Sequence, residues 1–354
     1  MSRRPTIGDV AVRAGVSPSA ISRWLNGRID LPEPTRTRIR DAVDHLNYQP
    51  HAQARRLSSG KAEVIGIVVP DIAWVAVAAG YDVVIWSTRN SVERELACFD
   101  RLAAGYADGL IIITNHEDDG RLASRIRPVR GRVVIVDENV PDTDAPKFFV
   151  ENEKGGYAAT SHLLDHGHRR IAHVGGPKGV MSAIERASGW RRALTERGYA
   201  PGAGWHIASE YEVEPARADA QVIFELDPTP TAVFAGSDAI ALGVMNAARD
   251  RGVSIPKDLS LVSFDGMTIN ELLGPPLSSI EQPIVALGRL GAECLLSMIE
   301  CKGTNQTNHK IQRLPVKVVA RGSVATLAES RPLACPHIAD RSQEIARDAR
   351  RTRR

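Results

Sequence analysis

The chain has 354 residues, of which 43% are hydrophobic and 25% charged, and this is ordinary globular usage in a chain long enough for two or three cores. Its net charge of +3 is unevenly distributed. Residues 1–60 hold ten Arg against five acidic residues, and residues 331–354 hold seven Arg against three. The two ends can therefore attract a polyanion, whereas the residues between them are acidic overall and have no electrostatic reason to bind nucleic acid.

Cysteine usage, targeting signals and catalytic motifs argue against several classes of protein. The four cysteines, Cys98, Cys294, Cys301 and Cys335, form no C-x-x-C pair, which indicates a reduced, cytoplasmic chain. The sequence has neither an apolar leader nor an uninterrupted apolar stretch of about 20 residues, so export and a membrane partner are not expected. G-x-S-x-G, P-loop and zinc signatures are missing as well. We therefore expect no enzyme, no catalytic residues, no cofactor and no metal.

Residues 6–26 predict two short helices joined by a tight turn. In the first helix Thr6 is the N-cap, and Gly15 ends the helix with a positive φ. The apolar residues of this helix recur with a period of about 3.6 residues, and they are Ile7, Val10, Ala11 and Ala14. Val16 is then predicted to pack as an apolar plug between the two helices.

The second helix is predicted to begin with Ser17 as N-cap and Pro18 at the first helical position, where the missing N–H of proline costs nothing. Its buried face is predicted to consist of Ala20, Ile21 and Leu25. The outer face carries short polar or cationic groups that can enter a major groove, and these are Ser19, Ser22, Arg23 and Asn26. Helical pairs with a glycine turn also occur in proteins that never contact DNA.

The segments after residue 26 favour a DNA-binding unit over a helical pair with another role. A third helix, Pro32–Leu46, closes a small three-helix core, and a short basic segment covers residues 48–57. The order V-S-x-x-x-x-S-R-x-L-N from Val16, and then N-Y-x-P-x-x-x-A-R-x-L from Asn47, resembles the LacI/GalR family of bacterial transcription regulators. The resemblance implies a small all-α helix-turn-helix DNA-binding domain (1–48), a hinge (49–62) and an α/β periplasmic-binding-protein-like domain (63–324). The pattern is lost beyond these residues, and the composition of 325–354 predicts a basic, disordered tail.

The same resemblance implies how DNA is bound. A homodimer would place two recognition helices in successive major grooves of a near-palindromic double-stranded operator. Ser19 and Arg23 would contact base edges, and Pro18 would make an apolar contact, for example with a thymine methyl. The phosphate contacts would come from Thr6, Ser17, Ser22 and Asn26.

The hinge has two interpretations. The resemblance implies a helix that forms on the operator and inserts Leu57 into the minor groove, with Ala54 and Arg55 beside it. The alternative is a flexible basic linker.

From Glu63 onward short β-branched runs alternate with helical runs, which predicts parallel sheets covered by helices on both faces. The predicted strands are Val64–Val69, Val83–Trp86, Leu110–Ile113, Val133–Val136, Ile171–Val174, Ala232–Ala235 and Leu259–Ser263. The resemblance implies two Rossmann-like subdomains with a ligand held between them. It places three chain crossings near Val150–Asn152, Gln282–Pro283 and Leu314–Val316.

One crossover is unusually short. Only the eleven residues Asp71–Tyr81 separate the first two predicted strands, whereas a parallel crossover usually needs a dozen or more. We expect at most two helical turns there. Because the family's full first helix carries ligand contacts and part of the dimer surface, both are predicted to be reduced in this chain.

Polar residues beyond the carboxyl ends of parallel strands are candidates for ligand contact, because open α/β sheets bind ligands there. The candidates are Asn115, Asp137, Arg186, Ser237, Asp265 and Gln282. The resemblance places Arg186 and Gln282 in the cleft, and a guanidinium there offers a planar fork of donors to vicinal hydroxyls or a carboxylate. Asp265 is the strongest acceptor candidate for a sugar hydroxyl. Asn115 and Asp137 have the alternative interpretation of simple turn residues.

Three histidines, His166, His168 and His173, lie close together in the sequence. We predict a structural use for them, because no second carboxylate or cysteine completes a metal-ligand set.

The sequence as a whole predicts a DNA-binding transcriptional repressor whose operator affinity is controlled by a small effector, a sugar or a related metabolite. Two alternatives stay open. One is a DNA-binding regulator with a degraded ligand-binding domain, suggested by the short crossover. The other is a sugar receptor that does not bind DNA.

Overall fold

The computed structural model describes residues 6–25, 29–46, 64–67, 72–300 and 311–327. The chain divides into two compact units, residues 1–63 and 64–354. Four residues of the predicted DNA interface lie outside the described residues, namely Asn26, Ala54, Arg55 and Leu57. The same is true of the hinge over 49–62 and of the tail beyond residue 327.

The first unit contains the three predicted helices, α1 (Ile7–Ala14), α2 (Pro18–Leu25) and α3 (Glu33–Leu46). Local chemistry fixes their ends. Thr6 and Asp9 form a capping box at the start of α1, and Gly15 leaves that helix with φ +64°. The Ser17 hydroxyl accepts a hydrogen bond from the Ala20 N–H at 3.2 Å and caps α2.

Each helix of this unit contributes one fully buried residue to the core. Val10, Ile21 and Ile39 are fully buried. The prediction for Leu25 was wrong, because 36% of this residue is exposed. Trp24 packs against the core instead. Its ring lies 5.9 Å from the Arg40 guanidinium carbon of α3, so the last turn of α2 directs Trp24 rather than Leu25 toward α3.

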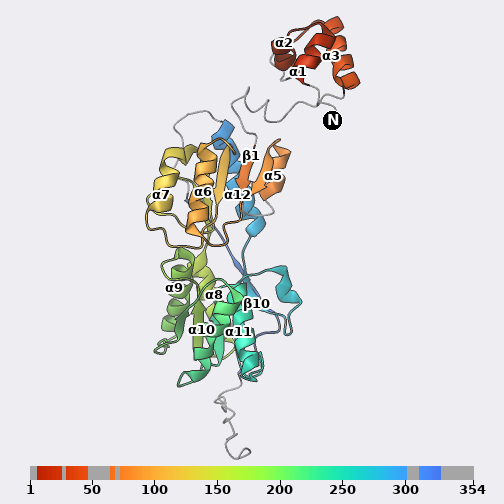
Figure 1. The fold of residues 1–354 in the computed structure, drawn as a ribbon. Helices are drawn as coiled ribbons and strands as arrows, with labels where there is room; N and C mark the ends of the chain where they lie inside the picture. Colours follow the sequence, from red (N-terminus) through yellow and green to blue (C-terminus); the bar gives the residue numbers. More distant parts are fainter. Residues whose placement is uncertain (1–5, 26–28, 47–63, 68–71, 301–310, 328–354) are drawn as a thin grey trace, which may run out of the picture. The chain divides into compact units, whose positions relative to one another are not determined.

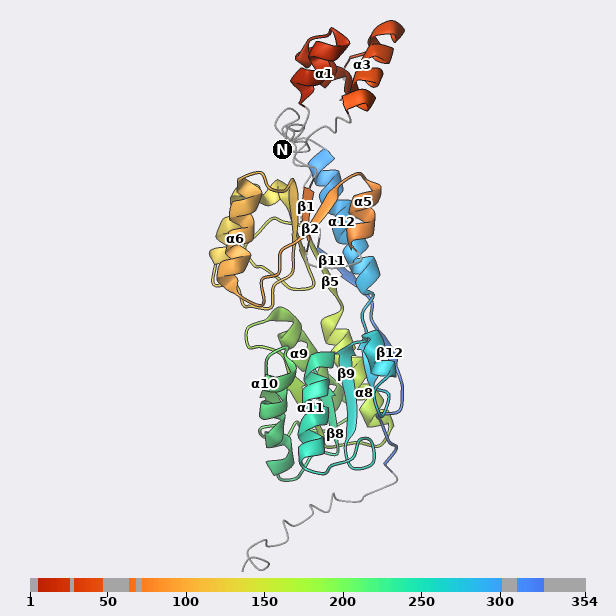
Figure 2. The same cartoon turned by 45° about the vertical axis from the view of Figure 1, so that its right-hand side comes forward.

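The second unit contains two lobes, each built on a six-stranded sheet (Figures 1 and 2). The sheet of the first lobe is parallel throughout, in the order β11-β5-β4-β3-β1-β2. Its strands are β1 (Val64–Ile67), β2 (Asp82–Ile85), β3 (Gly109–Ile112), β4 (Val133–Val136), β5 (Lys147–Val150) and β11 (Ile311–Leu314). The helices of this lobe are α5 (Ile72–Ala78), α6 (Val92–Ala103), α7 (Arg121–Ile126), the 3-10 helix η1 (Arg127–Arg132) and α12 (Ile284–Glu300).

The sheet of the second lobe has the order β12-β10-β9-β8-β6-β7, and only β12 is antiparallel to its neighbour. Its strands are β6 (Ile171–Gly175), β7 (His206–Ala208), β8 (Ala232–Ala235), β9 (Ser260–Asp265), β10 (Ser278–Glu281) and β12 (Lys317–Val319). Its helices are α8 (Asn152–Asp165), α9 (Met181–Glu196), α10 (Val213–Asp219), the 3-10 helices η2 (Ala220–Glu225) and η3 (Thr268–Glu271), and α11 (Asp238–Asp250). No helix in the described part of the chain is long and apolar enough to span a bilayer.

The chain passes between the lobes three times, from β5 to α8, from β10 to α12 and from β11 to β12. These are the positions at which the sequence predicts the crossings. All seven predicted strands occur, with ends that differ by one or two residues within the described part of the chain. Five further strands, β5, β7, β10, β11 and β12, were not predicted.

The short crossover forms as expected. The seven-residue helix α5 joins β1 to β2, which pair in parallel. Ala76 of α5 is fully buried, and α5 packs against α12. The long helix α12 therefore supplies the packing surface that stabilises this abbreviated element.

Helices α8 and α9 of the second lobe pack backbone to backbone, and this close approach depends on glycine. A Cβ atom on Gly189 would lie 2.1 Å from the Glu153 carbonyl oxygen, and one on Gly156 would lie 2.2 Å from the Arg186 carbonyl oxygen. Any larger residue would push the two backbones apart. The two glycines thus determine where α9 presents Arg186.

Replacing Gly189 with alanine should lower the free energy of unfolding of the second unit by about 1–3 kcal/mol, because overpacking against backbone outweighs the better helix propensity of alanine. Denaturant unfolding followed by circular dichroism measures this change. Gly131→Ala is the matched control, since no heavy atom lies within 4 Å of a Cβ built there. Equal stability of the two variants would contradict the packing argument.

Candidate functional site

A cavity of about 190 Å³ lies between the two lobes, beyond the carboxyl ends of their strands. The first lobe lines it with Asn115, which follows β3, and with Asp137 and Glu138, which follow β4. The second lobe lines it with Ser182, Arg186, Tyr211, Ser237, Ala239 and Asp265. Five of the six predicted ligand residues therefore meet in one cavity, and the sixth, Gln282, contacts one of them.

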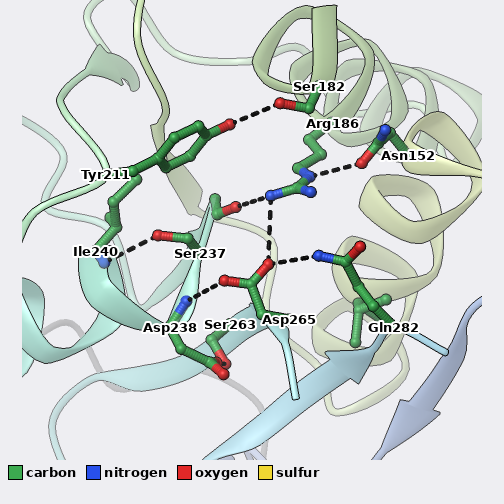
Figure 3. Close-up of polar contacts among 12 residues, drawn as sticks. Asn152, Ser182, Arg186, Tyr211, Ser237, Asp238, Ile240, Ser263, Asp265 and Gln282 are labelled. Carbon is green, nitrogen blue, oxygen red and sulfur yellow. Dashed lines mark hydrogen bonds and ion pairs between the residues drawn. The ribbon is translucent and has the colours of Figure 1, made fainter. Parts of the chain in front are cut away.

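Arg186 is buried and held on several sides (Figure 3). Its Nε donates to Asn152 Oδ1 at 2.9 Å, and its Nη1 donates to the Gly236 carbonyl oxygen at 2.6 Å. The guanidinium carbon lies 3.7 Å from the centre of the Phe264 ring, within the range of a cation–π interaction. These contacts fix the guanidinium plane and leave Nη2 available to a ligand.

Asp265 ends β9 at φ +105° and faces Arg186. One carboxylate oxygen lies 3.7 Å from Arg186 Nη1 and accepts a hydrogen bond from Gln282 Nε2 at 2.7 Å. The other accepts from the Asp238 N–H at 3.3 Å. Burial raises the pKa of Asp265 from its usual 3.8 to about 7, while Arg186 opposes this shift. Gln282, which the sequence places facing the ligand, instead holds the Asp265 carboxylate.

Ser237 and Asp238 behave differently from each other. The Ser237 hydroxyl accepts from the Ile240 N–H at 3.1 Å and caps α11. The Asp238 carboxylate is buried and does not line the cavity. It accepts hydrogen bonds from the Met267 N–H at 2.7 Å and from Asn270 Nδ2 at 2.8 Å. Asp238 thus fixes the loop that follows β9, whereas Ser237 lines the cavity.

The first lobe contributes two adjacent acids. Asp137 has φ +71°, and burial raises its pKa. Its Oδ1 is buried without a hydrogen-bond partner among the described residues. The sequence did not single out Glu138, whose carboxylate accepts from the N–H groups of Met181 at 2.9 Å and Ser182 at 3.2 Å. A side chain of one lobe thereby caps helix α9 of the other.

A second polar contact between the lobes joins Arg313 of β11 to Glu185 of α9, with both N···O distances at 2.7 Å. Arg313 lies in β11, the last strand of the first lobe along the chain, and Glu185 directly precedes Arg186. Together with Glu138, this ion pair fixes α9 against the first lobe.

Three further residues escaped the sequence analysis. Tyr211 and Ser182 contact each other through their hydroxyls at 3.0 Å, and burial raises the pKa of Tyr211 to about 12. Tyr211 follows β7, a strand that was not predicted, so its position could not be inferred. Asn152 begins α8 at the end of the predicted crossing Val150–Asn152, and this position was a signal that could have identified it.

The histidines have structural surroundings. His168 is buried, with Nδ1 3.0 Å from Thr231 Oγ1 and Nε2 3.0 Å from the Ala325 carbonyl oxygen. His173 donates from Nδ1 to the Phe234 carbonyl oxygen at 2.9 Å. Burial lowers the pKa of His168 to about 4 and that of His173 to about 3. Among the described residues no group of three or more His, Cys, Asp or Glu could hold a metal ion.

The outer face of α2 carries the predicted base-contacting residues Pro18, Ser19 and Arg23 and the predicted phosphate-contacting residue Ser22. Pro18, Ser19 and Arg23 are exposed and Ser22 is half-buried. Thr6 and Ser17 are exposed as well, and their hydroxyls take part in the helix caps.

Comparison with known proteins agrees with this architecture. Residues 6–51 match the family described as bacterial regulatory proteins, lacI family, and residues 160–324 match the periplasmic binding protein-like domain. The chain is 33% identical to the ribose operon repressor of Halalkalibacterium halodurans, an alignment that covers 89% of this chain and 96% of that protein. It is 30% identical to the HTH-type transcriptional repressor PurR of Vibrio atlanticus, over 91% and 99% of the two chains.

Two solved structures show the same fold at 26% sequence identity. The Lac repressor dimer bound to operator and the anti-inducer ONPF aligns with a TM-score of 0.78, over 91% of this chain and 100% of that chain. The complex of the transcriptional regulator CelR with cellobiose aligns with a TM-score of 0.67, over 90% and 100%.

Asp265→Asn should change how stability depends on pH. The carboxyl has a higher pKa when folded, so the stability it contributes is present below about pH 4 and is lost as the pH rises through about 7. Asparagine accepts a positive φ and does not ionise, so the variant should gain stability relative to the parent chain across this interval. Denaturant unfolding at pH 5, 6, 7 and 8 measures the difference, and parallel curves would show that Asp265 is not titrating there.

Proposed function

Because the chain belongs to the lacI family of bacterial regulatory proteins, we propose that it is a cytoplasmic repressor that binds a near-palindromic operator as a homodimer. A small polyhydroxylated ligand, a sugar or a related metabolite, would enter the cavity between the lobes and change the affinity for DNA. The observation that carries the proposal is the Arg186–Asp265 pair, fixed in a polar cavity bounded by both lobes. The relatives that are 33% and 30% identical to this chain are repressors, and the chain is a regulator, not an enzyme.

The cavity chemistry supports a hydroxyl-rich ligand. Arg186 offers the donors of Nη2, and Asp137 and Asp265 offer carboxylate acceptors. Vicinal hydroxyls donate and accept at neighbouring atoms, so one such pair can satisfy a guanidinium and a carboxylate at once.

The first unit supports DNA binding. Residues 1–60 carry a net positive charge, which favours a polyanion through release of counterions. Arg23 and Ser19 lie exposed on α2, where a recognition helix contacts base edges. Pro18 begins that helix and supplies an apolar surface in place of a hydrogen-bonding group.

The coupling between the two functions follows from the position of the cavity. A ligand in it contacts both lobes, so binding favours the arrangement in which the lobes are close. Glu138 contributes to the same arrangement, because its carboxylate reaches α9 only when the lobes are close. A ligand that binds the arrangement with close lobes more tightly shifts the protein toward it. When that arrangement holds the two DNA-binding units of the dimer at a different separation, the affinity for DNA changes as well.

The seven-residue α5 favours a second candidate, a repressor that binds its operator without a ligand response. The polar cavity argues for the first candidate, since it brings together Asp137 of the first lobe with Arg186 and Asp265 of the second.

A thermal-shift assay with D-ribose, D-glucose and D-galactose tests the ligand site, because a ligand that binds only the folded chain raises its melting temperature. The sugar that stabilises the parent chain should give no shift with Arg186→Ala. Arg191→Ala is the matched control, since this Arg lies one turn further along α9 and is exposed. An unchanged shift in melting temperature with Arg186→Ala would show that Arg186 does not contribute to sugar binding. If none of the three sugars shifted the melting temperature of the parent chain, the second candidate would be favoured.

Arg23→Ala should weaken binding to the best duplex selected from a random pool by about 1–3 kcal/mol and relax the preference at one base pair. Fluorescence anisotropy with the selected duplex and its single-base variants measures both effects. Arg13→Ala, which changes an exposed Arg of α1, should leave the base preference intact. An equal loss on every duplex would show that Arg23 contacts only phosphate.

A further inference from the structure

The residues between the two basic ends of the chain are acidic overall, but one short segment among them is strongly basic. Residues 121–132, which form α7 and η1, hold five Arg and no acidic residue. Like charges so close together repel one another and lower the free energy of unfolding, unless acids of the protein or an external anion offset them. The partners of the five side chains therefore show what the segment can bind.

Three of the five arginines have partners within the first lobe. Arg121 and Arg125 pair with carboxylates of α6, and Arg132 donates to three backbone carbonyl oxygens of residues 102–108. The other two, Arg127 and Arg130, belong to η1 and are exposed. Their guanidinium groups make no hydrogen bond or ion pair with the described residues, so their charge is free to attract an anion.

The topology of the first sheet places these two arginines at a defined edge. The segment η1 leads directly into β4, and Leu110 of β3 lies opposite both Gly66 of β1 and Val133 of β4. All three strands are parallel, so the end of η1 is level with the start of β1, two strand spacings or about 10 Å away across the sheet. The cavity between the lobes lies beyond the carboxyl ends of the strands, at the opposite edge.

The edge that carries η1 is also the edge at which the DNA-binding unit is attached. The first unit ends at residue 63, and β1 begins at Val64. A duplex bound by the first unit is therefore tethered to this edge by the shortest length of chain, and tethering raises its effective concentration there. This favours DNA over an acidic protein as the partner of the two arginines.

The guanidinium groups of Arg127 and Arg130 suit phosphate in particular. A guanidinium can bind a phosphate through two parallel N–H···O hydrogen bonds, and it keeps its charge throughout the physiological pH range. Phosphate contacts add affinity through the release of counterions and do not read the bases. Two such arginines can therefore bind a duplex whatever its sequence.

We propose that Arg127 and Arg130 form a second DNA contact of this protein, in which the first lobe binds phosphates of the duplex that flanks the operator. The contact is independent of sequence and adds to the sequence-specific contact of α2. This inference rests on the proposed function, since a bound operator brings the flanking duplex to the first lobe.

Fluorescence anisotropy of the full-length protein with two duplexes tests the proposal. One is the best duplex selected from a random pool, trimmed to the shortest length that keeps specific binding. The other extends it at each end by about 10 base pairs of unrelated sequence, one helical turn. Extension should tighten binding by the parent chain. Arg127→Ala/Arg130→Ala should bind the extended duplex about tenfold or more weakly than the parent at about 50 mM salt, and the short duplex equally well.

The salt dependence gives a second readout. Loss of two phosphate contacts per protomer should make the plot of log affinity against log salt concentration shallower by about 1.8 per protomer on the extended duplex. Arg127→Lys/Arg130→Lys keeps both charges and should retain most of the gain from extension. Arg94→Ala/Arg191→Ala is the matched control, since it removes two exposed arginines elsewhere, from the first turn of α6 and from α9.

The outcomes separate this inference from the proposed function. If extension did not tighten binding by the parent chain, or if the η1 variant and the control lost the gain equally, the flanking contact would be wrong and the operator-binding repressor would stand. An equal loss on the short and the extended duplex would also contradict a flanking contact. If the parent chain preferred no selected duplex over unselected DNA, the proposed function would be wrong together with this inference.

Discussion

The guanidinium of Arg186 is the group on which the polar centre of the second unit depends. Its bonds to Asn152 and to the Gly236 carbonyl, and its contact with the Phe264 ring, come from three different elements. The close approach of α8 to α9 brings it there, and glycine makes that approach possible. A buried cation is costly unless it is paired and hydrogen-bonded, so the surrounding acceptors and the opposing Asp265 carboxylate form one interdependent arrangement.

The acids around this cation explain how the two lobes can act on each other. Asp137 and Glu138 come from the first lobe, and Glu138 completes the N-terminus of α9, whose own N-cap residue, Val180, supplies no side-chain cap. Negative charge at a helix N-terminus is stabilising, so closing the lobes adds a favourable contact even before a ligand binds. A ligand that contacts both lobes binds this arrangement better than one in which they are apart, and that difference in affinity is how a small molecule can shift the equilibrium.

Much of this could be predicted from local sequence. The helix-turn-helix unit followed from the caps at Thr6 and Ser17 and the left-handed turn at Gly15, because such signals act within a few residues. The central strands of both sheets followed from their β-branched runs. Two of the strands that were not predicted, β7 and β12, are three-residue edge strands without a buried residue, and their sequences resemble loops. The interior strands β5 and β10 are buried, but they are only four residues long and include a charged residue each. Leu25 was misplaced because it lies one helical turn after the buried Ile21, a spacing that lets both face a core, whereas the adjacent Trp24 packs there instead.

The sequence by itself determined the family resemblance, the alternation of strands and helices, the shortened first crossover and most residues of the cavity, because polar residues that follow strands leave a local pattern. Only the tertiary structure decided the roles of these residues. Gln282 positions Asp265 instead of facing the cavity, Glu138 bridges the lobes, and Tyr211 enters from a loop after an unpredicted strand. These roles depend on contacts between residues 17 to 44 positions apart, which no local pattern can encode.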